Sequence, residues 1–404
     1  MKGTQNMKPK NITAVCTAGM LALFLFGGCA KTRKAGGQMD TPEVHYEQGM
    51  KYYNQGEITR AGDEFDLART LDFKYAPAYA GLALVAGEKA RVEKNPKLAE
   101  KGFDKAYEYI EKAKDLDKKL VAAWLAYGMV ITMQHMADED KEWVENALEQ
   151  YDKVIAKLDP ACSEAYYRKG WTLKYAFKFR DAADQFKKVL DLDKTYTKEA
   201  DEQWNIMQNI ERAAPGSKIG MKIALIEKIS RADVAALFMS ELDAANLIQK
   251  KRPKNYDTDF KAPDDPRTLE AQKTVTMAEA TDIATHWARN FINDVVNLQV
   301  RGLEPYPDHT WKPDLLITRG EYAFMLEDIL IAILRDESLA TKHIGASESR
   351  FPDVNPSAPF YNAICNMVDK NVMDANIDGE FKALDPVSGA DALLVIRKLK
   401  ELKK

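Results

Sequence analysis

The chain has 404 residues, of which 46% are hydrophobic and 30% are charged, and its formal net charge at pH 7 is −4. This composition excludes a disordered chain and a collagen-like fibre, and 4 cysteines are too few for a small disulfide-stabilised scaffold. The slight acidic excess argues against a general nucleic-acid binder.

Residues 1–28 have the pattern of a secretory signal peptide. Lys2, Lys8 and Lys10 form a positive region, and an apolar run over 12–26 follows it. The run is shorter than the ~20 residues that a membrane-spanning helix needs. It ends in Gly27-Gly28-Cys29, which resembles the lipobox of bacterial lipoproteins, although Phe26 replaces the usual leucine. The resemblance implies that Cys29 becomes the lipid-modified N-terminus; the alternative is an ordinary cleaved signal followed by an incidental cysteine.

The residues after Cys29 give expectations about location. Ala30 follows the cysteine, and by resemblance to Gram-negative sorting this favours the outer membrane, facing the periplasm or the cell surface. Residues 29–40 are mostly polar, and we expect them to form a flexible tether.

Residues 41–215 repeat a pattern of small and aromatic residues. Gly49, Ala83, Gly128 and Gly170 hold the same place in four successive units, and the first two are 34 residues apart. The pattern resembles the tetratricopeptide repeat (TPR), whose unit is a pair of antiparallel helices. The resemblance predicts a mainly α solenoid of four helix pairs, closed by a cap helix over 198–213.

In the TPR family the first helix of each pair lines a concave groove that binds a protein segment. An apolar and adaptable surface of this kind suits a partner segment better than a charged terminus. The alternative is that several of the groove residues pack against insertions at 87–105 and 132–146. The expected groove residues are Met50, Tyr53, Leu125, Met129, Tyr167, Trp171 and Tyr175.

Residues 216–404 contain three helix-start motifs of the capping-box type, in which a Ser or Thr is followed three residues later by an acid. With the upstream sequence Phe351-Pro352-Asp353-Val354 and the later turns, they resemble the S-layer homology (SLH) domain. The resemblance implies three helical copies around a pseudo-threefold axis. The first copy is partial, and its first helix is expected to come from the cap helix, over 204–213. The motifs pair Ser230 with Asp233, Thr318 with Glu321, and Ser388 with Asp391.

SLH domains bind cell-wall polymer, either pyruvylated polysaccharide or peptidoglycan. Arg231 and Arg319 follow the N-cap, where free backbone N–H groups and the helix dipole favour an anion. Gly389 replaces the arginine of the third copy, which puts that pocket in doubt. The alternative is that the arginines cover neighbouring surface while the tryptophans fill the core. The expected polymer-binding residues are Arg231, Arg319, Ser230, Thr318, Asp233, Glu321, Trp311 and Trp287, the tryptophans by stacking on a sugar.

No catalytic motif accompanies these modules, since the zinc-protease, nucleophile-elbow and P-loop patterns are missing from the sequence. The alternative is a pair of carboxylates for glycoside hydrolysis, which the 62 acidic residues would permit. Residues 374–385 begin like an EF-hand calcium loop, but Lys382 holds its ninth position, so we expect no metal and no cofactor.

These features together predict a non-catalytic, lipid-anchored adaptor of the cell envelope. It would contact the membrane through its lipid, wall polymer through 216–404, and an unidentified envelope protein through the groove, and it would bind no nucleic acid. The alternative is a scaffold subunit of an export or electron-transfer assembly, whose SLH-like region docks protein.

Overall fold

The computed structural model describes residues 33–138, 141–248 and 280–402. The secondary structure of these residues is helical and includes no β-strand, which confirms the predicted mainly α fold. None of the helices in this described part is both long and apolar enough to cross a bilayer. The expected signal peptide and Cys29 lie outside the described residues.

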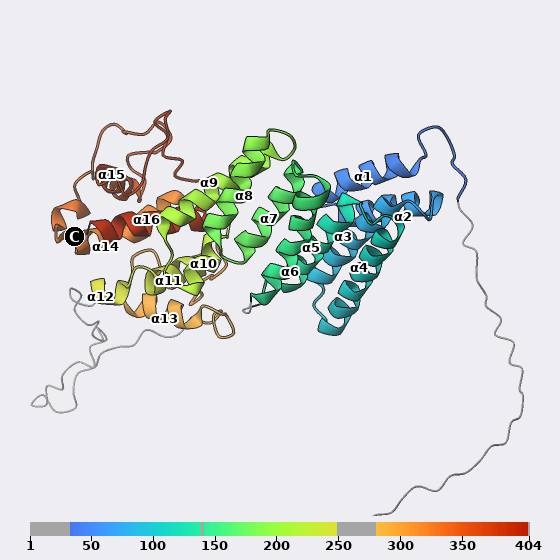
Figure 1. The fold of residues 1–404 in the computed structure, drawn as a ribbon. Helices are drawn as coiled ribbons and strands as arrows, with labels where there is room; N and C mark the ends of the chain where they lie inside the picture. The colour runs from blue at the N-terminus through green and yellow to red at the C-terminus, as the bar shows by residue number, and fades with distance from the viewer. Residues whose placement is uncertain (1–32, 139–140, 249–279, 403–404) are drawn as a thin grey trace, which may run out of the picture.

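Helices α1 to α9 form the array of antiparallel pairs (Figure 1). Helix α1 packs on α2, α3 on α4, α5 on α6 and α7 on α8, and α9 packs on α8 as a closing helix. A π-helical turn, Val154–Leu158, continues α6. The bounds are α1 Pro42–Asn54, α2 Ile58–Leu71, α3 Ala76–Val92, α4 Pro96–Leu116, α5 Val121–His135, α6 Glu142–Lys153, α7 Ser163–Tyr175, α8 Phe179–Leu192 and α9 Thr197–Ala213.

The small residues of the repeat let the helices of a pair approach closely. A Cβ atom added to any of three glycines would come within 2.5 to 2.7 Å of an aromatic ring on the paired helix. The large ring therefore needs the small residue opposite it, as the repeat pattern predicts. These contacts join Gly49 to Phe65, Gly128 to Tyr151, and Gly170 to Phe186.

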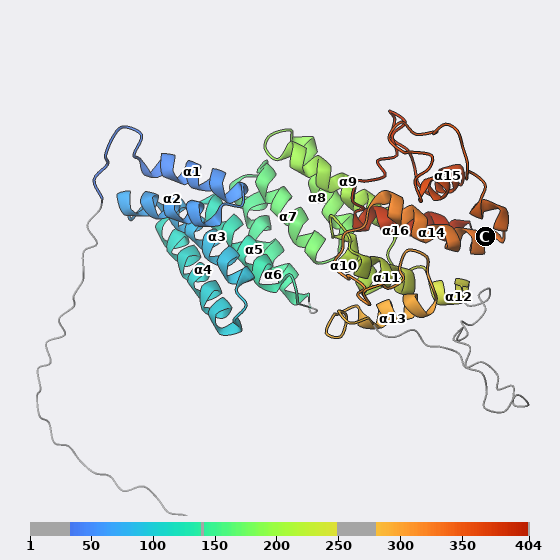
Figure 2. The same cartoon turned by 180° about the vertical axis from the view of Figure 1, so that it is seen from behind.

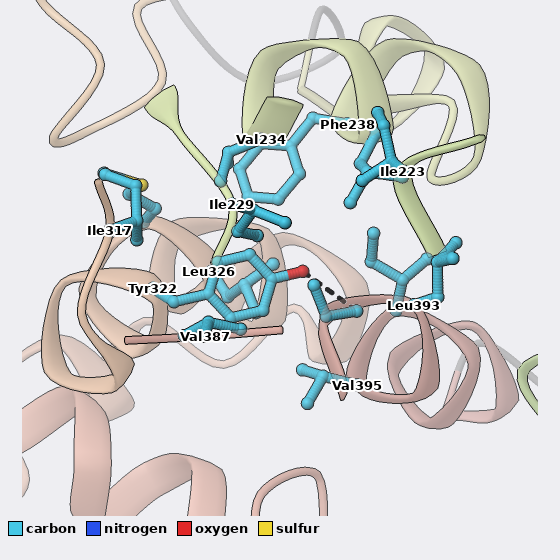
Figure 3. Close-up of a cluster of buried hydrophobic side chains, with 14 of the residues drawn as sticks. Ile223, Ile229, Val234, Phe238, Ile317, Tyr322, Leu326, Val387, Leu393 and Val395 are labelled. Atoms are coloured by element: carbon cyan, nitrogen blue, oxygen red, sulfur yellow. Dashed lines mark hydrogen bonds between the residues drawn. The ribbon is translucent and has the colours of Figure 1, made fainter. Parts of the chain in front are cut away.

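The remaining helices form a three-lobed module around a common axis. At the axis three backbone hydrogen bonds close a ring: Ile229 N–H donates to Val387 O, Val387 N–H to Ile317 O, and Ile317 N–H to Ile229 O, at 2.9 to 3.1 Å. Figure 3 shows the side chains of these residues packed with Tyr322 and Leu326 in one buried cluster. The bounds are α10 Lys218–Ala224, α11 Arg231–Ser240, α12 Ala244–Ile248, α13 Arg289–Asn297, α14 Arg319–Leu334, a 3₁₀ turn Glu337–Ala340, α15 Tyr361–Asp369 and α16 Gly389–Glu401.

The helices of this module pack in a cycle that includes α9. Helix α13 packs on α11, α15 packs on α14, and α9 packs on α16. Because α9 holds the place that α13 and α15 hold in the other copies, it is the first helix of the partial first copy. The cap helix of the array and the missing helix of the module are therefore one helix.

The hydrophobic core divides at a different point from the sequence modules. One buried cluster runs from Tyr53 to Ala165 and lies within α1 to α7. A second runs from Tyr167 to Leu399 and joins α7, α8 and α9 to the three-lobed module. A small third cluster, from Ile131 to Ala176, joins α5 and α6 to the end of α7. The molecule is elongated, with α1 and α2 at one end and α15 at the other (Figures 1 and 2).

Candidate functional site

The predicted capping boxes at Ser230 and Thr318 are formed in full. The Ser230 hydroxyl accepts from Asp233 N–H, and the Asp233 carboxylate accepts from Ser230 N–H at 2.8 Å. Thr318 and Glu321 repeat this exchange at the start of α14. These four side chains hold the helix starts, and an arginine directly follows each cap.

Arg231 connects the first copy to the turn of the second. Its guanidinium donates three hydrogen bonds to backbone carbonyls, to Gly302 O at 2.7 Å, Trp311 O at 3.0 Å and Glu304 O at 3.1 Å. It also lies 4.6 Å from the centroid of the Trp311 ring. The side chain is only 5% exposed, and burial lowers the pKa of the guanidinium from its usual value. Arg231 therefore joins two copies as well as placing a positive charge between them.

Arg319 makes the same connection between the second copy and the third, with fewer contacts. Its Nε donates to Phe381 O and its Nη2 to Asp374 O, both at 3.0 Å, and its guanidinium lies 4.8 Å from the Phe381 ring centroid. Burial also lowers the pKa of Arg319, although this side chain is partly exposed. Of the two arginines, Arg319 has more surface available to a ligand.

An aspartate holds each of these turns from the opposite side. The Asp353 carboxylate accepts from the N–H groups of Phe381 at 2.8 Å and Lys382 at 2.7 Å. Burial would raise the pKa of Asp353, but these backbone donors lower it below its usual value. Asp282 accepts from Trp311 N–H and Lys312 N–H in the same way, both at 2.8 Å. The sequence analysis missed Asp282, although Thr281-Asp282-Ile283 repeats the Pro352-Asp353-Val354 pattern.

The two tryptophans expected to stack on sugar differ in exposure. Trp311 has no exposed surface, and its Nε1 donates to Leu303 O at 2.8 Å. The expectation that Trp311 stacks on a sugar is therefore wrong, because its ring is buried between the first and second copies, against the Arg231 guanidinium. Trp287 is 56% exposed and remains a surface on which a sugar ring can stack.

A junction is the contact between the arginine end of one copy and the turn of the next. The third junction, between the third copy and the first, has no room for a side chain at position 389. A Cβ atom at Gly389 would overlap the carbonyl of Ile223, at the end of α10. Helix α10 and the following residues lie where a full first copy would present its turn, and Gly389 N–H donates to Ile226 O at 2.8 Å. The missing arginine is thus a consequence of the partial first copy, and the module has two arginine junctions rather than three.

The array contains a cavity of about 570 Å³ on the inner side of its helices. Both inserted segments contribute to it, through Glu88 and Arg91 and through Met133 and Met136. Leu125 is instead buried in the core at 5% exposed, so the expectation that it lines the groove is wrong. Met50 is partly buried against the same core and is not among the residues that line this cavity. Of the predicted groove residues, those that line the cavity are Tyr53, Met129, Tyr167, Trp171 and Tyr175.

The charged residues at this cavity are largely paired within the chain. The Arg168 guanidinium lies 3.0 Å from the Glu164 carboxylate, and Arg91 lies 2.8 Å from Glu88. Lys174 does not line the cavity but lies 4.2 Å from the ring centroid of Trp171, which does, and burial lowers the pKa of Lys174 to about 8. The cavity thus presents aromatic and methionine side chains beside two paired arginines and the carboxylate of Glu199.

No three or more His, Cys, Asp or Glu side chains in the described ranges gather into a group that could hold a metal ion. The EF-hand-like stretch instead supplies the turn that receives Arg319. Asp374 at its start forms a 2.7 Å ion pair with Lys398.

Comparisons with known proteins agree with the three-lobed module. Residues 350–393, which contain the third copy, match the model of the S-layer homology domain. No curated protein matches the chain. One solved structure that matches is described as "Crystal structure of YrrB: a TPR protein with an unusual peptide-binding site", with 21% identity over 40% of this chain and 90% of that chain. Its TM-score of 0.19 is too low to support an argument about shape. The matched domain and the cyclic arrangement of the helices identify residues 350–393 as one copy of an SLH-type module.

Proposed function

We propose that this protein is a non-catalytic adaptor of the cell envelope. It is anchored by a lipid at Cys29, binds cell-wall polymer through its SLH copies, and holds a protein partner in the cavity of the array. The observation that carries the proposal is the SLH match over 350–393, together with the three-lobed module around it. The anchor is placed at the outer membrane, on the sequence of the residues around Cys29.

Wall binding is assigned to the two junctions that contain Arg231 and Arg319. Each junction places a guanidinium beside an aromatic ring and next to a helix N-terminus, where an acidic sugar is favoured. The exposed Trp287 adds a stacking surface. The third junction is closed at Gly389, so two sites are proposed per chain.

The first test is co-sedimentation of the full chain with purified wall sacculi, comparing Trp287→Ala with Trp124→Ala. Trp287 is an exposed side chain of the module, whereas Trp124 is a partly exposed tryptophan of the array. We expect Trp287→Ala to weaken wall binding by about fivefold, which is about 1 kcal/mol, without changing the melting temperature. Trp124→Ala should retain binding. Equal binding by both variants would reject Trp287 as a sugar contact.

The arginines need a test that separates binding from stability. Because Arg231 and Arg319 donate to carbonyls of the neighbouring copy, alanine there removes part of the connection between copies. Binding of the Arg231→Ala, Arg319→Ala double variant is therefore measured at a temperature where its circular dichroism matches that of the unmodified protein. Loss of binding by the folded variant supports the junction sites, and full binding by the same variant rejects them.

The second candidate function is a scaffold subunit of an envelope export or electron-transfer assembly. The contacts of Arg231 favour it, since backbone carbonyls already occupy the guanidinium and Trp311 is buried. Crosslinking in cells from a photoreactive residue at Tyr175 discriminates the two. Capture of a protein from the cavity by a chain that does not sediment with sacculi would favour the scaffold.

A further inference from the structure

The residues that precede α1 are attached to the first helix pair. Arg33 N–H donates to Thr70 O, near the C-terminal end of α2, at 2.8 Å. Residues 33–40 therefore do not act as the flexible tether that we expected over 29–40.

Asp40 organises this attachment. One carboxylate oxygen accepts from the Arg33 guanidinium at 2.8 Å and from Gly36 N–H at 2.5 Å. The other lies 2.8 Å from the His45 ring, whose second nitrogen lies 2.6 Å from Glu64 on α2. The segment, α1 and α2 are thus joined by one polar network.

This attachment limits how far the array can lie from the membrane. Cys29 precedes Arg33 by four residues, and four residues span at most about 14 Å when fully extended. A lipid on Cys29 would hold that residue at the level of the lipid headgroups. Arg33, and the end of α2 to which it is bonded, must then lie within about the same distance of the bilayer surface.

We propose that the corner of the array made by residues 33–40 and 70–75 lies against the headgroups of the bilayer that holds the lipid. The inference rests on the proposed lipidation of Cys29 and adds an orientation and a contact surface to it. The surface suits a headgroup layer, because Met39 is 73% exposed and the two stretches also expose Lys34 and Lys74, against one exposed acid, Asp72. The negative charge of Asp40 is taken up by Arg33 and His45.

The elongated shape of the molecule then indicates where the SLH-type module lies relative to the bilayer. The α1 and α2 end and the α15 end are at opposite ends of the elongated chain (Figures 1 and 2). With the corner at the bilayer, the SLH-type module projects away from the membrane, and the cavity of the array lies between the two.

The test measures the distance of two labelled positions from the bilayer. The lipidated full chain carries Cys162→Ala, so that the buried Cys365 is the only other thiol in the described residues. Fluorophores are attached at Lys74→Cys or, as the matched control, at Lys94→Cys. Both lysines are exposed and flank α3, whose 17 residues separate them by about 25 Å. The protein is placed in vesicles of phosphatidylethanolamine and phosphatidylglycerol with a nitroxide on some headgroups.

We expect several-fold stronger quenching at Lys74→Cys than at Lys94→Cys. A flexible Gly-Ser spacer of about 20 residues after Ala30 extends the connection by roughly 25 Å and should remove the difference. Equal quenching in the chain without a spacer, or a difference that persists with the spacer, would overturn the inference. A chain that carries no lipid by mass spectrometry and does not bind vesicles would instead reject the proposed anchor, so the two failures are distinguishable.

Discussion

Arg231 and Arg319 each connect two copies of the module, and the proposed wall binding uses the same side chains. Their positions after the caps could be predicted from the sequence, because a capping box is local and needs only residues three apart. Their partners could not be predicted, because Gly302 and Trp311 are 71 and 80 residues away from Arg231 in the chain. The pairing arises only when the three copies close around the axis. A sequence motif therefore located the side chain but not what it contacts.

Gly389 gives a test of why the third junction lacks an arginine. We expect Gly389→Ala to lower the free energy of unfolding by at least about 2 kcal/mol, because the added methyl group would overlap the Ile223 carbonyl. Chemical denaturation measures the change. Gly37→Ala is the control, since a Cβ there has no neighbour within 4 Å. An unchanged stability of Gly389→Ala would mean that α10 does not close the junction in solution.

His45 gives a pH-dependent test of the polar network that joins residues 33–40 to α1 and α2. Burial alone would lower the pKa of His45, but its hydrogen bonds to the carboxylates of Glu64 and Asp40 raise it above its usual 6.5. A raised pKa means that the folded state binds the proton more tightly, so this stabilisation is present below about pH 6.5 and is lost as the pH rises through the folded value. The stability difference between the protein and His45→Gln, followed by denaturation from about pH 5 to 8, should shrink as the pH rises. A difference that is constant or grows over this range would contradict the charged network.

Helix α9 belongs to both sequence modules, and this accounts for the most informative departure from the predicted domains. The sequence predicted a cap helix and suggested that the first SLH copy borrows it, since both patterns are visible in the residues around Trp204. The predicted boundary between the two modules, at residues 215 and 216, rests by contrast on Pro215-Gly216, and these residues do follow the end of α9. A turn can be predicted from adjacent residues, whereas the extent of a hydrophobic core depends on which helix faces pack together in the folded protein.

The shared helix predicts how truncated modules behave. A fragment of residues 194–404 keeps α9 on α16, while a fragment of residues 217–404 exposes the face of α16 that α9 covers. The helix contributes Met207 and Ile210, both with no exposed surface. Their burial is worth roughly 3 to 6 kcal/mol, so the shorter fragment should melt roughly 6 to 24 °C lower. Calorimetry of the two fragments checks this, and equal melting temperatures would mean that the module does not need α9.

The two buried clusters predict which parts of the whole molecule unfold together. Helix α8, with Tyr167 and Leu173 of α7, shares its core with the SLH-type module, although the repeat pattern assigns both helices to the array. Ala165 of α7 belongs to the first cluster, and the small third cluster joins α5 and α6 to Ala176 at the end of α7. Polar contacts also join α7 to α5 and α6. The hydroxyls of Thr132 and Thr172 lie 2.8 Å apart, and Thr172 donates to the Tyr151 hydroxyl at 3.3 Å. Such bonds contribute about 1 kcal/mol each, less than the buried apolar surface on either side.

Native-state hydrogen exchange with two matched core variants tests this division. Met207→Ala and Ile110→Ala each truncate a side chain with no exposed surface, one in each cluster, and each should cost about 2 to 5 kcal/mol. We expect Met207→Ala to speed exchange in α7, α8 and the module while α1 to α4 keep their protection. Ile110→Ala should do the reverse. If α7 and α8 instead follow Ile110→Ala, the array unfolds as the repeat pattern divides it, and a ligand bound at Tyr167 and Trp171 would not be held rigidly to the three-lobed module.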